Sequence, residues 1–134
     1  MLNHHIDHFK TKTIRIKTMK IAILDDWLNC ALDSCDWSRL GADVTVDVFH
    51  DTIAGTALVE RLQPYDIICM MRERTPIDAA LMDKLPNLRG IITSGMRNAA
   101  LDIDAAKSRG LMLSGTSSPG HATSELAFLS LIHI

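Results

Sequence analysis

The segment "RGIITSGMRNAALDIDAAKSRGLMLSG", Arg89–Gly115, contains the pattern that decides the fold class. Two short apolar runs, residues 90–94 and 111–115, flank an amphipathic stretch that begins at Asp102 and ends before Gly110. Apolar runs of this length are typical of strands that are buried on both faces. A glycine directly after a helix suits its left-handed exit. Strand, helix and strand in this order predict a parallel βαβ unit.

Three apolar runs upstream extend this pattern. The runs "KIAILDD" (20–26) and "DIICMM" (66–71) are continuous and predict central strands. The run "VTVDVFH" (44–50) alternates apolar and polar residues, which is typical of a half-buried strand at a sheet edge. Together the runs favour an α/β fold in three layers, with a flavodoxin-like parallel sheet of strand order 2-1-3-4-5.

Helical patterns separate these runs. Leu58 and Leu62 share one face of a helix that Pro64 ends. A second helix is expected to start at "TPID", with Thr75 as the capping residue and Pro76 in the first helical position.

Length and composition indicate one soluble domain. The chain has 134 residues, of which 47% are hydrophobic and 22% charged, and its net charge is −2. That charge favours neither nucleic acid nor an anionic membrane surface as a partner. No apolar run approaches the roughly 20 residues that a membrane helix needs.

The cysteines indicate the cellular compartment, and the first residues indicate where the domain begins. Cys30, Cys35 and Cys69 form no C-x-x-C pair, so we expect free thiols in the cytoplasm and no metal site. Residues 1–18 are polar and basic without an apolar centre. We expect them to be a disordered or non-native extension before a domain that spans 19–118.

Cationic side chains mark the predicted binding edge. Ligands of parallel α/β sheets bind beyond the carboxyl ends of the strands, and Arg72, Arg74 and Arg97 follow strands at that edge. Gly95 is expected to let the backbone turn so that amide N–H groups converge. This combination suits a carboxylate or a phosphate. The alternative is that these arginines pair with nearby acidic side chains on a solvated rim.

Two other site types fit the sequence poorly. The acidic pair Asp25-Asp26 after the first strand is reminiscent of a phosphate-accepting receiver domain. A receiver also needs an aspartate at the end of the third strand and a lysine at the end of the fifth, but these ends read Met71-Arg72 and Ser114-Gly115. A dinucleotide loop, G-x-G-x-x-G, needs glycines two residues apart, and the chain has none at that spacing.

The segment "MRERTPIDAALMDKLPNLRGIITSGMRNAALDIDAAKSRGLMLSGTSSPGHATSELAF", Met71–Phe128, carries a family resemblance. From Met19 to about Phe128 the sequence resembles the N-terminal part of the D-isomer-specific 2-hydroxyacid dehydrogenases. The order R-x-x-T, "LPNL", glycine loop, "RG" and "GT…A-T-x-E" is characteristic in combination. The resemblance implies a two-domain oxidoreductase that transfers hydride between NAD or NADP and a 2-hydroxy or 2-oxo acid, as a homodimer. Residues 19–118 would be its substrate domain. Residues 119–134 would start the helix toward an NAD-binding domain beyond this chain.

The resemblance also implies roles for individual residues. The backbone at Gly95 and Met96 would meet the substrate carboxylate, with Arg72 nearby, and Thr123 would lie near the cofactor. Arg97 stands where many members have a second glycine, which adds a charge at the substrate. The family's catalytic Arg, Glu and His belong to the second domain, so this chain alone is expected to have no catalytic residue, no metal and no activity.

Two further expectations concern the chain as a whole. The alternative function is a stand-alone small-anion binding or regulatory module on the same flavodoxin-like scaffold. The final "LSLIHI" resembles a translated sequencing adapter, so residues from about Ser130 are expected to be non-native.

Overall fold

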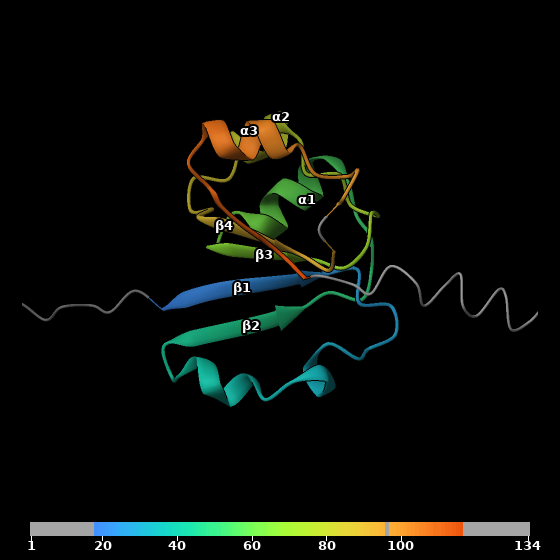
Figure 1. Cartoon of the computed structure of the whole chain (residues 1–134), viewed down its shortest axis with the longest axis vertical. Helices are drawn as coiled ribbons and strands as arrows, with labels where there is room; N and C mark the ends of the chain where they lie inside the picture. The colour runs from blue at the N-terminus through green and yellow to red at the C-terminus, as the bar shows by residue number, and fades with distance from the viewer. Residues whose placement is uncertain (1–17, 96, 117–134) are drawn as a thin grey trace, which may run out of the picture.

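A computed structural model describes residues 18–95 and 97–116 (Figure 1). Its five strands form one sheet in the order β2-β1-β3-β4-β5, and each neighbouring pair is parallel. This order confirms the predicted flavodoxin-like arrangement. The strands are β1 (Met19–Leu24), β2 (Val44–Val48), β3 (Ile67–Met70), β4 (Gly90–Thr93) and β5 (Met112–Gly115).

Three α-helices lie on one face of the sheet (Figure 1). They are α1 (Gly55–Leu62), α2 (Ala79–Met82) and α3 (Ile103–Ser108). The strands place alternate side chains on this face because their period is two. The core combines sheet residues with helix residues; its members include Ala22, Leu24, Ile68, Met70, Ile91, Leu58, Leu62, Leu81, Met82 and Ala106.

The opposite face is covered by shorter segments, the 3₁₀ helices η1 (Leu32–Ser34) and η2 (Trp37–Leu40). Trp37 lines an apolar pocket of about 300 Å³ there, beside Cys69 and Ile92 of the sheet. Ile92 remains 38% exposed. Among residues 18–95 and 97–116, the third layer of the predicted fold is therefore thin. Burial raises the pKa of the Cys69 thiol to about 11, so this thiol is protonated at neutral pH.

The ends of the helices confirm one prediction and correct another. Asp102 caps α3 by accepting the Ala105 N–H at 2.9 Å, and Gly110 leaves that helix at φ +68° as expected. Thr75 does not cap α2; Asp78 does, by accepting the Leu81 N–H at 2.8 Å. The chain stays extended through Ile77 because this residue forms a parallel bridge with Leu101.

Candidate functional site

The segment Arg72–Thr75, which we call the rim segment, follows β3 at the carboxyl edge of the sheet. Arg72 adopts φ +69°, the left-handed region that few non-glycine residues occupy. Its N–H donates to Ser94 Oγ at 3.1 Å, and its carbonyl accepts from Asn98 Nδ2 at 3.2 Å. The chain after β4 therefore fixes the backbone of Arg72, while the residue itself is exposed.

The other end of the rim segment is fixed from β1. The Arg74 guanidinium donates to the Asp25 carbonyl oxygen at 3.2 Å and lies over the Trp27 ring, 5.0 Å from its centroid. Thr75 Oγ1 donates to Asp25 Oδ2 at 2.8 Å and is buried. The segment thus spans the edge between β1 and β4, with a contact at each end.

Three acidic side chains near this edge bind backbone groups. Glu73 accepts the Ala99 N–H at 3.0 Å, and Asp78 and Asp102 are occupied as helix caps. Within residues 18–95 and 97–116, the ion pairs are Arg61–Asp51 and Arg109–Asp83, and none involves Arg72, Arg74 or Arg97. The pairing that would make these three arginines a solvated rim does not occur among the described residues. Arg72 and Arg97, both exposed, therefore have no acidic partner among the described residues.

Asp25 is a buried carboxylate at the end of β1, exposed by 3%. It adopts φ +60°. Besides Thr75, which follows β3, the hydroxyl of Thr52, which follows β2, donates to this carboxylate. One side chain therefore connects the chain after three neighbouring strands. Sequence reasoning considered Asp25 only for a receiver site; the signal for this role is an aspartate directly after a buried strand.

Asp26, its neighbour, is 1% exposed, and its carboxylate bonds within its own loop. Its carboxylate accepts the Cys30 N–H at 3.1 Å and the Ala31 N–H at 2.9 Å. Burial alone would raise the pKa of Asp26, but the hydrogen bonds from Ala31 and Cys30 outweigh it and bring that pKa below its ordinary value. His50, whose Nδ1 lies 2.7 Å from the Asp26 carbonyl, acts in the same direction.

A close backbone approach joins the ends of β4 and β5. A Cβ at Gly115 would lie 2.6 Å from the Gly95 carbonyl oxygen, so the position requires glycine. A Cβ at Gly95 would meet nothing nearer than the Arg97 carbonyl at 3.7 Å, and the φ of Gly95 is outside the left-handed region. The steric need for glycine therefore lies at Gly115, not at Gly95 as the sequence suggested.

Of the other predicted site residues, the structure describes Arg97 but not Met96 or Thr123. Arg97 is exposed after β4, close in sequence to Gly95. Met96 and Thr123 lie outside the described residues, so their predicted contacts remain predictions.

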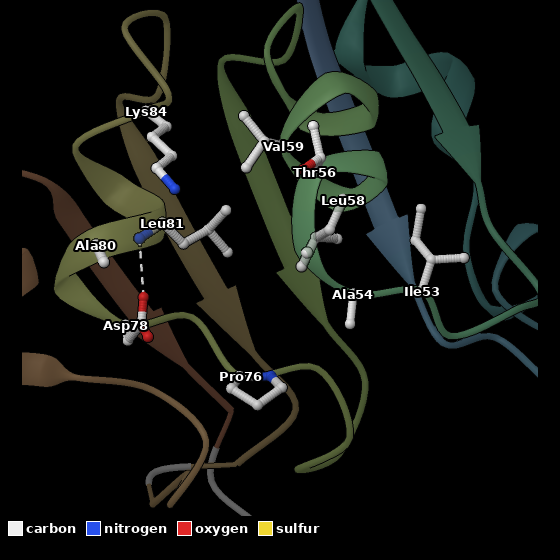
Figure 2. Close-up of a pocket in the computed structure, with 11 residues that line it drawn as sticks. Ile53, Ala54, Thr56, Leu58, Val59, Pro76, Asp78, Ala80, Leu81 and Lys84 are labelled. Carbon is white, nitrogen blue, oxygen red and sulfur yellow. Dashed lines mark hydrogen bonds between the residues drawn. The ribbon is translucent and has the colours of Figure 1, made fainter.

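A hollow of about 360 Å³ lies between α1 and α2 (Figure 2). Its walls are largely aliphatic, and its acid, Asp78, is bonded to the Leu81 N–H. Lys84 lies on the α2 side of the hollow (Figure 2). We assign no chemistry to this hollow, because its acid is already used as a helix cap.

Comparison with known proteins identifies the family. The family described as D-isomer specific 2-hydroxyacid dehydrogenase, catalytic domain, matches residues 21–131. The chain belongs to this family. A search of curated protein sequences gives no match.

Solved dehydrogenases share the fold. A phosphoglycerate oxidoreductase from Vibrio cholerae O395 is 32% identical with a TM-score of 0.71, over 85% of this chain and 36% of its own. An oxidoreductase from Ralstonia solanacearum, named as a D-3-phosphoglycerate dehydrogenase, is 30% identical with a TM-score of 0.71, over 84% of this chain and 34% of its own. A D-lactate dehydrogenase from Aquifex aeolicus with NAD and lactic acid, 12% identical with a TM-score of 0.62, covers 84% of this chain and 32% of its own, and shows the fold alone. The chain thus spans about a third of the length of these dehydrogenases.

The described residues contain neither a cluster of metal ligands nor a membrane-spanning helix. No group of three or more His, Cys, Asp or Glu side chains within residues 18–95 and 97–116 could bind a metal ion. In the same part of the chain, no helix is long and apolar enough to cross a membrane.

Proposed function

We propose that this chain is the substrate-domain part of an NAD(P)-dependent D-2-hydroxyacid dehydrogenase. In that reaction hydride moves between a nicotinamide and the carbon that bears the hydroxyl of a 2-hydroxy acid. The observation that supports this role is Arg72, an exposed guanidinium on a backbone held in the left-handed region and bonded to Ser94. A guanidinium without an acidic partner suits the carboxylate of a 2-hydroxy or 2-oxo acid. The backbone at Gly95 and Met96, with Arg97, would complete the contacts.

The cofactor is assigned to a second domain. The chain contains no two glycines spaced as in G-x-G-x-x-G, the loop that cradles a dinucleotide pyrophosphate. NAD or NADP would supply the hydride from a domain beyond residue 134, and Thr123 would lie near it on the helix that starts in residues 119–134. Residues 19–118 would bind and orient the acid, and residues 1–18 would take no part. The complete protein would be a homodimer.

The test compares the 134-residue chain with the complete gene product. Both are assayed for oxidation of NADH and NADPH with glyoxylate, pyruvate, hydroxypyruvate and 3-phosphohydroxypyruvate. The last is included because two relatives are named for phosphoglycerate. We expect turnover of at least one acid by the complete product and none by the 134-residue chain, which lacks the cofactor loop. Turnover by the short chain, or no turnover and no cofactor binding by the complete product, would contradict the proposal.

A stand-alone small-anion binding module is the second candidate function. The same observation favours it, because Arg72, Arg74 and Arg97 form no ion pair within the described residues. Titration of the 134-residue chain with oxalate and inorganic phosphate separates the two functions. Saturable binding by the short chain, together with a gene that encodes no G-x-G-x-x-G after residue 134, would support the binding module over the dehydrogenase.

A further inference from the structure

The carboxylate of Asp25 connects the loops around the rim segment. Its two oxygens accept the hydroxyls of Thr52 and Thr75, and its carbonyl accepts from the Arg74 guanidinium. A carboxylate that is 3% exposed and bonded at both oxygens is poorly accessible to a ligand. Asp25 therefore acts on its neighbours, not on a bound molecule.

A chain of contacts also connects the Asp25 carboxylate to the Arg74 side chain. Thr52, which donates to Asp25, also accepts the Trp27 indole N–H at 3.3 Å. The Trp27 ring in turn lies against the Arg74 guanidinium. Asp25 thus fixes Arg74 directly through its carbonyl and indirectly through Thr52 and Trp27.

From these contacts we propose that Asp25 is a positioning residue, which sets the place of Arg72 and Arg74 by anchoring the Thr75 end of the rim segment. The segment has no regular secondary structure, and three of its four residues are exposed. Its order therefore depends on contacts to the surrounding chain, which are Ser94 and Asn98 at Arg72, Ala99 at Glu73 and Asp25 at Thr75. Asp25 is the contact that holds the Thr75 end. The effect on substrate rests on the proposed function, because it requires these arginines to face the acid.

Release of the Thr75 end would weaken substrate binding without changing the chemical step. A guanidinium that samples more positions loses more conformational entropy when it binds a carboxylate. The cost appears when the substrate binds, so KM rises while kcat stays nearly constant. A purely structural role would lower stability and leave KM unchanged.

The kinetic test uses Asp25→Asn in the complete protein, with Asp26→Asn as the matched control. Asparagine tolerates the left-handed φ of Asp25, so the change removes the charge and leaves the backbone preference. Asp26 is equally buried but its carboxylate bonds Cys30 and Ala31 in its own loop. We expect Asp25→Asn to raise KM for the 2-oxo acid about fivefold to tenfold, with kcat within about twofold. Asp26→Asn should leave KM unchanged. An unchanged KM in Asp25→Asn, or an equal rise in both variants, would overturn the proposal.

A second test on the 134-residue chain does not depend on activity. Hydrogen exchange of the amides in residues 72–75 should be about tenfold faster in Asp25→Asn and in Thr75→Val than in the unmodified chain. Thr75→Ser keeps the hydroxyl, so its exchange rate should equal that of the unmodified chain. Asp26→Asn should not alter the rate either. Unchanged exchange in both Asp25→Asn and Thr75→Val would reject the positioning role. If the complete protein turns over no acid, the proposed function fails, and this exchange test still decides whether Asp25 positions the segment.

Discussion

Asp25 and Arg72 share an unusual backbone conformation but differ in burial and in the contacts of their side chains. They adopt φ +60° and +69° at the carboxyl ends of β1 and β3, which are neighbours in the sheet. The Asp25 side chain is buried and bonded at both oxygens, whereas Arg72 is exposed and forms no ion pair among the described residues. A left-handed non-glycine residue is costly unless its surroundings enforce it. At Asp25 the strained backbone accompanies a side chain that links three loops. At Arg72 it accompanies a side chain that is exposed to solvent.

The largest effect on stability is expected for Asp25→Gly. Glycine removes the backbone strain, but it leaves the buried hydroxyl of Thr75 and the exposed hydroxyl of Thr52 without their acceptor. Loss of two such contacts should lower the free energy of unfolding by about 2–4 kcal/mol. Urea denaturation of the 134-residue chain measures it. A loss below about 1 kcal/mol would mean that water replaces the carboxylate, and the contrast with Arg72 would then disappear.

The next largest effect extends the comparison to the ends of β4 and β5. Gly115→Ala would place a Cβ 2.6 Å from the Gly95 carbonyl oxygen, which is a backbone atom and cannot rotate away. The strands must shift, and overpacking of this kind typically costs about 1–3 kcal/mol. Gly95→Ala is the matched control, because its Cβ would stay 3.7 Å from the nearest atom. Equal losses of thermal stability in the two variants would show that the close approach is not the cause.

The sequence predicts the fold better than it predicts the site, for physical reasons. Continuous and alternating apolar runs report which strands are central and which lie at the edge, because burial acts on each strand separately. The link made by Asp25 joins residues 27 and 50 positions away, and no local pattern encodes such pairs. The need for glycine at Gly115 likewise comes from a distant residue, because the Gly95 carbonyl that follows β4 lies against it. The prediction that Thr75 caps α2 is wrong for the same reason, because the Thr75 hydroxyl donates to Asp25, which is distant in sequence.

Asp26 adds a pH-dependent test to the comparison. Its hydrogen bonds outweigh burial and lower its pKa in the folded chain, so its carboxylate stabilises the fold above the pKa of the unfolded state. That contribution is lost as the pH falls through the lower, folded pKa. Asp26→Asn should therefore be less stable than the unmodified chain at neutral pH, and the difference should shrink below about pH 4. Denaturation midpoints across this range measure it. A difference independent of pH would show that the charge of Asp26 has no part in stability.

The smallest effect on stability is expected for Arg72→Gly, the same change that damages the fold at Asp25. Glycine adopts φ +69° without the steric cost of a Cβ, and the Arg72 backbone contacts to Ser94 and Asn98 remain. The relief of about 1–2 kcal/mol is partly offset by the greater freedom of glycine in the unfolded chain, so the free energy of unfolding should stay constant or rise by up to about 1 kcal/mol. In the complete protein, KM for the 2-oxo acid should rise about tenfold or more, because a charge-assisted contact to the carboxylate is lost. Arg72→Lys, which keeps the charge, should raise KM less. If Arg72→Gly instead destabilises the fold and leaves KM unchanged, the guanidinium serves the structure, and Arg72 is not part of the substrate site.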